Sequence, residues 1–176
     1  MKNLTGIENL KSLTSLEIIQ CDSLKNITGI ENLKSLISLE VEGDYEFENI
    51  ASIENSKSLT NLTILRNNKL KGLTGIDNLK SLLFLSLLGC DSLKSFAGIG
   101  DLKSLTNLNI SGNGGLENLI GIDKIDSLIS LDISSNDGLK NLKGINNLKW
   151  VTSLNISNNQ KIESIAEIEN LKSLTV

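Results

Sequence analysis

Residues 6–28 read GIENLKSLTSLEIIQCDSLKNIT, and the rest of the chain repeats this stretch. A glycine or a substitute for it opens the same frame every 23 residues without insertion or deletion, at Gly6, Gly29, Ser52, Gly75, Gly98, Gly121, Gly144 and Glu167. Seven full repeats therefore follow residue 6, with partial repeats on either side. So strict a period indicates stacked units, each of which buries its apolar side only against its neighbours. We expect residues 1–176 to form one solenoid.

The first half of each repeat has the alternation of a β-strand with one buried face. Residues 13–21 spell L-x-x-L-x-I-x-x-C, in which Leu16 and Ile18 alternate with polar Ser15 and Glu17. The same apolar pair recurs in the six later repeats as Leu39/Val41, Leu62/Ile64, Leu85/Leu87, Leu108/Ile110, Leu131/Ile133 and Leu154/Ile156. Seven parallel strands should therefore lie side by side.

The second half of each repeat carries apolar residues at a spacing of three. In the first repeat these are Leu24, Ile27, Ile30 and Leu33. The spacing predicts 3₁₀ or short helical turns that carry the chain back along the outer side. An acidic residue there precedes a lysine by three residues, as Glu8 precedes Lys11. Such residues are neighbours on a helix, so we expect weak ion pairs along a solvated outer side.

The motif and its period resemble the leucine-rich repeat family. NLKSLTSLEIIQCDSLKNITGI, residues 9–30, most resembles the short bacterial repeats of internalin-like proteins. One extra residue before Leu24, and Gly-Ile in place of a Pro-Leu pair, also bring the motif near the L domains of receptor ectodomains.

The resemblance implies an α/β solenoid: a right-handed superhelix with a parallel sheet on its concave side and 3₁₀ or short helical turns on its convex side. It further implies protein binding on the concave sheet, in a bacterial surface or effector protein, and it does not imply catalysis.

The residues needed for common catalytic and metal sites are missing from the sequence. The chain contains no histidine, so neither a Ser-His-Asp nor a Cys-His arrangement nor an imidazole ligand can form. Cys21 and Cys90 occupy a position after the strand where most repeats have asparagine, and three repeats separate them, too far for a disulfide. Glu17 and Glu40 should lie side by side, as two solvated acids or, alternatively, as a cation-holding pair. We expect no enzyme, no cofactor and no metal.

Charge and hydropathy favour a protein as the partner. The net charge is −4 and the lysines are spread along the whole chain, which argues against a nucleic-acid surface. No apolar run approaches the roughly 18 residues of a membrane span, and residues 1–10 lack a signal region. We expect no membrane insertion, and either a cytosolic chain or a fragment of a secreted or surface protein.

The outward strand positions differ between the two halves of the chain. The later repeats have mostly serine and asparagine there, whereas Phe84, Leu65 and Leu88 are apolar. Four polar or charged residues should lie beside them: Arg66, Glu40, Glu42 and Tyr45. These seven residues form a predicted binding surface that we call the concave patch. The alternatives are surface drift, or a Phe84 that covers a packing defect at Ser56, where serine replaces a core leucine.

Trp150 and the two outermost coils are further candidates for contact with a partner. Trp150 replaces a serine found in the other repeats, and it is either an anchor for a partner or a cover over the last coil. Without caps, the outermost coils should expose Leu10, Leu13 and Leu16 at one end and Ile165, Ile168, Leu171 and Leu174 at the other. Either flanking residues cover them or copies stack head to tail, so self-assembly is the alternative function.

Overall fold

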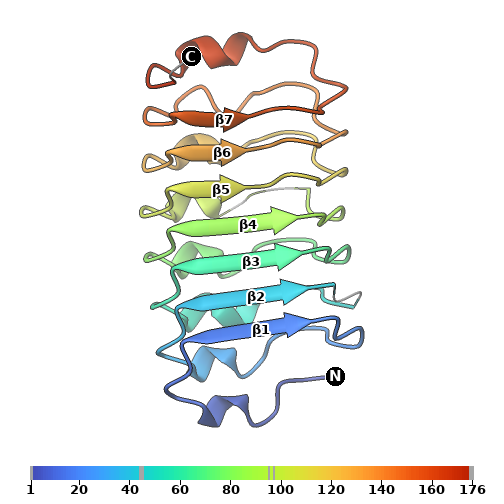
Figure 1. The fold of residues 1–176 in the computed structure, drawn as a ribbon, viewed down its shortest axis with the longest axis vertical. Helices are drawn as coiled ribbons and strands as arrows, with labels where there is room; N and C mark the ends of the chain where they lie inside the picture. Colours follow the sequence, from blue (N-terminus) through green and yellow to red (C-terminus); the bar gives the residue numbers. More distant parts are fainter. Residues whose placement is uncertain (1, 44–45, 95, 97, 175–176) are drawn as a thin grey trace.

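In a computed structural model, which describes residues 2–43, 46–94, 96 and 98–174, the strands form one parallel sheet in chain order. Four strands of five residues come first: β1 (Ser15–Ile19), β2 (Ser38–Glu42), β3 (Asn61–Leu65) and β4 (Phe84–Leu88). Three strands of three residues follow: β5 (Asn107–Asn109), β6 (Ser130–Asp132) and β7 (Ser153–Asn155). Figure 1 shows them stacked like rungs.

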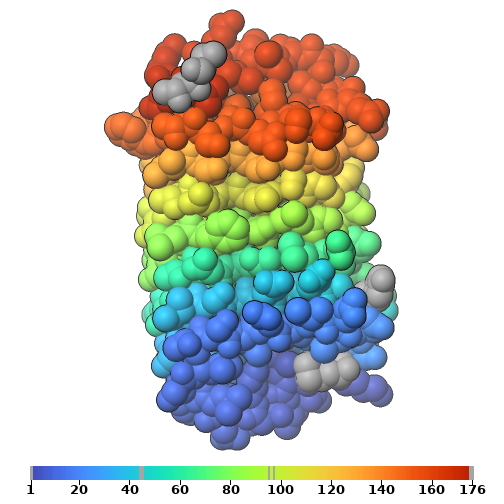
Figure 2. All heavy atoms as spheres, viewed as in Figure 1, coloured from blue at the N-terminus to red at the C-terminus, as the bar shows by residue number. Residues whose placement is uncertain are grey.

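The register of the sheet follows the repeat period. Leu16 pairs with Leu39 and Leu39 with Leu62, and every later pair is likewise offset by 23 residues. Each coil therefore lies on the next in the same frame, and the bands of Figure 2 follow the chain from one end to the other. Because equivalent residues of successive coils are neighbours in space, a substitution changes the contacts of one coil with the coils directly before and after it.

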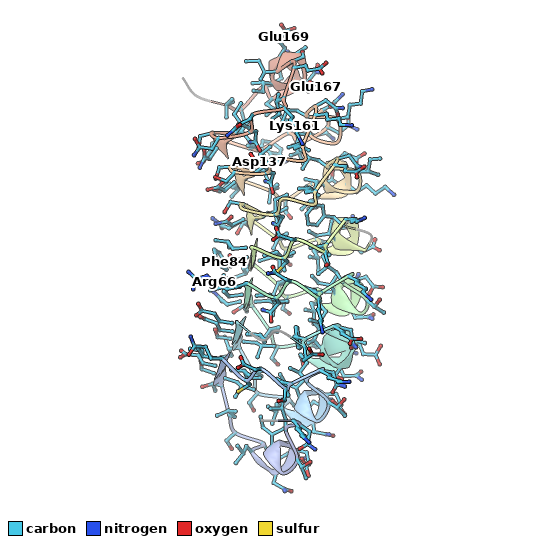
Figure 3. The ribbon with its side chains drawn as sticks, turned by 90° about the vertical axis from the view of Figure 1, so that its right-hand side faces the viewer. Arg66, Phe84, Asp137, Lys161, Glu167 and Glu169 are labelled. Atoms are coloured by element: carbon cyan, nitrogen blue, oxygen red, sulfur yellow. The ribbon has the colours of Figure 1, made fainter. Side chains whose placement is uncertain are left out.

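Short 3₁₀ helices occupy the side opposite the sheet. They are η1 (Ile7–Asn9), η2 (Ile30–Asn32), η3 (Ala51–Asn55), η4 (Ile76–Asn78), η5 (Ile99–Asp101), η6 (Ile122–Lys124) and η7 (Ala166–Asn170). Figure 3 shows the stack bowed, with the sheet on the inner side of the curve and the helices on the outer side. This arrangement confirms the predicted solenoid.

The opening glycine sets the length of the 3₁₀ helix. Gly6 and its glycine equivalents have φ between 90° and 110°, a left-handed conformation that suits glycine. Helices η3 and η7 belong to the repeats in which Ser52 and Glu167 replace that glycine, and they have five residues rather than three. Without the left-handed residue the backbone stays in the helical region, so these helices begin two residues earlier.

The predicted ion pairs on the outer side are wrong. Among the described residues, salt bridges join only Arg66 to Glu42 and Lys69 to Glu46. The carboxylate of Glu31 instead accepts the backbone N–H of Gly29 at 2.8 Å, and Lys34 donates to the carbonyl of Glu31 at 2.6 Å. The acids cap the turn and the lysines satisfy its carbonyls, so the two side chains do not meet.

An asparagine ladder joins neighbouring coils behind the sheet. Asn113 Nδ2 donates to the carbonyls of Leu87 and Ile110 at 2.8 and 2.7 Å, while its Oδ1 accepts the N–H of Cys90 at 2.7 Å. Asn136 Oδ1 accepts the N–H of Asn113 in the same way. These bonds satisfy backbone groups that the bend after each strand leaves outside the sheet.

Strands β1 to β4 are longer than β5 to β7, and the residue at the second outward position of each strand explains the difference. Asn109, Asp132 and Asn155 each use a side-chain oxygen to accept the N–H of the residue two places later, at 3.0, 2.9 and 3.1 Å. Such turns end the extended conformation, so β5, β6 and β7 stop early. Glu17, Glu40, Thr63 and Ser86 stand at these positions in β1 to β4, which run two residues further.

The two outermost coils are only partly exposed. Leu10 is 52% exposed and Ile165 is 56% exposed, as predicted. Leu13, Leu16, Ile168 and Leu174 are half-buried. Leu171 is 5% exposed, so its predicted exposure is wrong; the residue follows η7 and packs inward on the core.

Candidate functional site

Arg66 stands at the centre of the candidate site, directly after β3. Its Nη1 lies 3.1 Å from Oε1 of Glu42, the last residue of β2, yet 79% of its side chain is exposed. At this exposure the ion pair contributes about 1 kcal/mol or less to stability. The pair therefore orients Arg66 and leaves most of its guanidinium donors for a partner.

The backbone of Arg66 is left-handed, with φ of 56°. The equivalent residue has positive φ in all seven coils: Gln20, Gly43, Arg66, Gly89, Gly112, Ser135 and Asn158. This conformation costs a side chain other than glycine, asparagine or aspartate about 1–2 kcal/mol. Both neighbouring coils have glycine at this position, so the side chain of Arg66 projects with no equivalent side chain on either side of it.

Two open hollows lie on either side of Arg66 because the flanking glycines lack side chains. The larger has a volume of about 650 Å³ and is lined by Gln20, Asp22, Glu42, Gly43, Arg66, Asn68, Gly89 and Asp91. The smaller, about 290 Å³, is lined by Glu42, Leu65, Arg66, Leu88, Gly89, Ser111, Gly112 and Ser135. The first is largely polar and acidic, and the second has an aliphatic wall.

The apolar part of the concave patch lies on β3 and β4. Leu65 and Leu88 are register partners at the ends of these strands, and both are half-buried. Phe84 begins β4, is also half-buried, and points off the sheet on the same side as Arg66 in Figure 3. Ser86 faces outward between Phe84 and Leu88 but is only 5% exposed. Leu65 and Leu88 thus lie beside Arg66 at one end of the strands, whereas Phe84 lies on the same face at the other end of β4.

The acidic part of the patch lies on β1 and β2. Glu40 and Glu42 face outward on β2, and Glu40 is paired in register with Glu17 of β1. Neither the carboxylate of Glu17 nor that of Glu40 has a hydrogen bond or ion pair to another described residue. The described residues also hold no group of three or more His, Cys, Asp or Glu side chains that fits a metal ion. Tyr45, the remaining member of the predicted patch, lies outside the described residues.

The alternative account of Phe84 does not fit the structure. Ser56 is buried, as predicted, and its Oγ has no hydrogen-bond partner among the described groups. However, Ser56 follows η3 on the outer side of the coil, whereas Phe84 points away from the opposite face of the sheet. Phe84 therefore does not cover the defect at Ser56.

Trp150 belongs to a different surface. It precedes β7, at the opposite ends of the strands from Arg66, and it is 60% exposed, so it does not cover the last coil. The residues immediately before β2, β4 and β6 are Ile37, Leu83 and Ile129, each 46% exposed. These three residues lie on alternate coils, with Thr60 and Thr106 between them, and a reading of the strand positions alone misses them because they precede the strands.

Cys90 is a structural thiol. It is fully buried, and burial raises its pKa from 9.0 to about 11, although the N–H of Asn67 opposes the shift. The Sγ lies 3.7 and 3.8 Å from the carbonyls of Leu88 and Ile64, in the place of the asparagine amide of other coils. Cys21, by contrast, is half-buried. A buried, protonated thiol is a poor nucleophile.

No helix among the described residues has the length and hydropathy needed to cross a membrane. No protein-family model and no curated protein matches the chain. Similarity to solved structures, by contrast, extends over almost the whole chain.

Internalin C2 from Listeria monocytogenes is 25% identical, with a TM-score of 0.79 over 94% of this chain and 70% of that chain. A leucine-rich repeat protein from Leptospira interrogans is 23% identical, with a TM-score of 0.74 over 99% of this chain and 56% of that one. TLR13, solved in complex with ssRNA13, is 23% identical, with a TM-score of 0.66 over 98% of this chain and 29% of that one. The last two share the fold alone.

The 23-residue period, the in-register parallel sheet and the similarity to internalin C2 are mutually consistent. Every full repeat has its strand at the same place, and a 3₁₀ helix lies at or directly after the opening position in all of them except the repeat that Gly144 opens. The chain is therefore a leucine-rich repeat solenoid, and its repeats are similar to those of internalin C2.

Proposed function

We propose that the chain is a non-catalytic protein-binding domain that recognises a protein partner through the concave patch. It would serve in a bacterial surface or effector protein, a proposal supported by the bacterial sources of internalin C2 and of the Leptospira protein. The candidate contact residues are the described members of the patch: Phe84, Leu65, Leu88, Arg66, Glu40 and Glu42.

The left-handed conformation of Arg66 is the observation that carries this proposal. Arginine adds strain at a position where the two neighbouring coils have glycine, and the exposed ion pair with Glu42 returns little stability. A residue that costs stability and remains exposed is typical of a functional surface. Leu65 and Leu88 beside it, and Phe84 at the other end of β4, supply the aliphatic and aromatic contacts that dominate protein interfaces.

The charge of the sheet favours a protein over a nucleic acid. The seven strands contain four carboxylates, Glu17, Glu40, Glu42 and Asp132, and no lysine or arginine. A phosphate backbone would meet these acids with only Arg66 to offset them. TLR13 has the same fold and was solved with RNA, so a binding assay with single-stranded RNA is a direct test of this preference.

A photo-crosslinking experiment tests the proposed surface. A photoreactive amino acid replaces Ser111, which lines the smaller hollow, and cross-linked proteins are identified by mass spectrometry. We expect a protein adduct that is lost when Phe84 is replaced by asparagine, the residue found at the equivalent positions 61 and 107. The same photoreactive residue in place of exposed Ile120, beyond the sheet, is the control. An adduct that survives Phe84→Asn, or forms equally at position 120, would contradict the proposal.

Self-association is a second candidate function. The exposed side chains of Leu10 and Ile165, on the first and last coils, support stacking of a second copy. Such head-to-tail contacts are heterologous and lead to open filaments. Light scattering during size-exclusion chromatography tests this candidate: mass that rises with concentration and falls on Leu10→Lys supports it, whereas a constant monomer mass contradicts it.

A further inference from the structure

The order of charges and apolar groups along the stack specifies the chemistry of the partner. Outward carboxylates lie on β1 and β2, the Arg66–Glu42 pair follows, and the aliphatic wall of Leu65 and Leu88 lies on β3 and β4. The polar side chains of β5 to β7 come after them. The patch is thus divided into an acidic half and an apolar half along the axis of the solenoid.

The acidic half lacks internal compensation. Glu17 and Glu40 are direct register partners, so two residues of like charge stand side by side with their backbones about 5 Å apart. Like charges at such positions destabilise a sheet, and neither carboxylate has a hydrogen bond or ion pair to another described residue. A cationic group from outside would relieve this repulsion.

The other outward acid, Asp132, differs from this pair. Its Oδ1 accepts bonds from the N–H and hydroxyl of Ser134, and its Oδ2 accepts one from Asn155 Nδ2 at 3.0 Å. The structure therefore uses Asp132 to form a turn, whereas Glu17 and Glu40 carry no comparable structural bond. The carboxylates without such bonds, Glu17 and Glu40, lie on β1 and β2, next to the strands that carry Leu65 and Leu88.

The spacing of the two halves suits one short peptide segment. The middle of the Glu17–Glu40 pair and the middle of the Leu65–Leu88 pair are two strand spacings apart across the sheet and two residues apart along it, or about 12 Å in total. A few residues of extended chain cover this distance. Arg66 and Glu42 lie between the two halves, where Arg66 can donate to a carbonyl of the same segment.

We propose that the partner presents a segment that is basic at one end and apolar at the other. Its lysine or arginine side chains lie on Glu17 and Glu40, and its aliphatic or aromatic side chain lies on Leu65 and Leu88. Complementary charge raises the association rate and excludes acidic competitors, while the apolar contact provides most of the affinity. This inference rests on the proposed function, because it assumes that the concave patch is the binding surface.

Selection from a phage library of random 12-residue peptides tests the inference with a defined probe. The library is selected against the whole chain at low ionic strength, and the enriched peptides are sequenced and synthesised. We expect an excess of lysine and arginine over the unselected library, next to at least one large apolar residue. The affinity of the synthesised peptides should fall as salt is added, because the ion pairs lie at the protein surface.

A matched set of variants identifies which carboxylates are responsible. Glu17→Gln combined with Glu40→Gln should weaken the peptides about tenfold or more, the effect of losing about 1.4 kcal/mol. The control removes the same charge elsewhere, by Asp137→Asn combined with Glu163→Gln, two exposed residues beyond the patch. The control should bind with unchanged affinity.

The outcomes separate this inference from the proposed function. If peptides lose binding on Phe84→Asn but are not basic, or tolerate the loss of Glu17 and Glu40, the inference is wrong and the concave patch stands. If peptides bind Phe84→Asn as well as the original chain, both the patch and the inference are wrong. Basic peptides that depend on both Phe84 and the two glutamates establish the inference.

Discussion

Arg66 and Glu42 form an ion pair of 3.1 Å between the ends of two neighbouring strands, and Arg66 is held in a left-handed backbone conformation while it does so. Glycine stands at the equivalent place in the coils before and after. The pair therefore divides two hollows, one lined by acids and the other by Leu65 and Leu88. The outward residues of this half of the sheet, rather than the repeat itself, carry the proposed binding surface.

Replacement of Ser56 by leucine should stabilise the fold. Ser56 is 2% exposed, and its hydroxyl has no hydrogen-bond partner among the described groups. Leucine is the usual residue at this core position and removes the unsatisfied hydroxyl, so we expect a gain of about 1–3 kcal/mol in the free energy of unfolding in urea. Ser56→Ala, which removes the hydroxyl without filling space, should gain less. A loss of stability on Ser56→Leu would show that no space remains at this position.

Replacement of Asn113 by alanine should weaken the stack strongly. The change leaves two buried carbonyls and the N–H of Cys90 without their partner. We expect a loss of about 3 kcal/mol or more in urea unfolding, because unsatisfied buried groups cost about 1–3 kcal/mol each. Asn107→Ala, at an exposed outward position, is the control and should change stability by about 0.5 kcal/mol or less. Equal effects of the two variants would show that the ladder contributes little.

The buried thiol of Cys90 should make the fold sensitive to alkaline pH. Its pKa is raised by burial from 9.0 to about 11 in the folded chain, so the folded state keeps this proton after the unfolded state has lost it. Stability is therefore fully present below pH 9 and falls between pH 9 and 11, by about 1.4 kcal/mol per pH unit at most.

The variant Cys90→Asn is the control for this pH dependence. Asparagine is the ladder residue of most coils and does not titrate, while the lysines titrate in both proteins. The difference in stability between the two proteins, measured by urea unfolding at each pH, should change above pH 9 and stay constant below it. A constant difference up to pH 11 would contradict the raised pKa. A thiol reagent should also modify half-buried Cys21 before Cys90.

Replacement of Trp150 by serine should stabilise the chain slightly. Ser58, Ser104 and Ser173 occupy the same place in other repeats, and each donates its hydroxyl to a carbonyl of the coil before, at 2.7 to 2.8 Å. Serine at position 150 would face the carbonyl of Asp126, and such a bond is worth about 1 kcal/mol. A higher thermal midpoint for Trp150→Ser supports this account. A midpoint several degrees lower would show instead that Trp150 packs productively on its neighbours.

The sequence was sufficient to predict the strands, their register and the 3₁₀ turns, because an unbroken period places each residue against its equivalent in the next coil. Leu16 and Leu39 need no structure to be recognised as neighbours. The same argument places Leu65 beside Leu88 and puts Phe84 on the same face of β4.

Side-chain choices among competing partners were harder to predict. Glu31 and Lys34 each bind a backbone group instead of forming an ion pair with each other. The 3₁₀ turn places the N–H of Gly29 next to the Glu31 carboxylate and the carbonyl of Glu31 next to the Lys34 ammonium. The left-handed backbone of Arg66 was also missed, although glycine at positions 43 and 89 was a usable signal for it. Trp150, predicted separately as a contact residue, precedes β7 and lies at the opposite ends of the strands from Arg66.

The most direct test of the account is the dissociation constant of a partner, or of a peptide selected on the chain, for Phe84→Asn and Arg66→Asn. Asparagine tolerates the left-handed conformation and already occupies the place of Arg66 at position 158, so both variants should unfold near the urea concentration of the original chain. We predict that each raises the dissociation constant about tenfold or more, while Ser134→Ala, on the polar half of the face, leaves it unchanged. Unchanged affinity in both patch variants, with the fold intact, would contradict recognition through the concave patch.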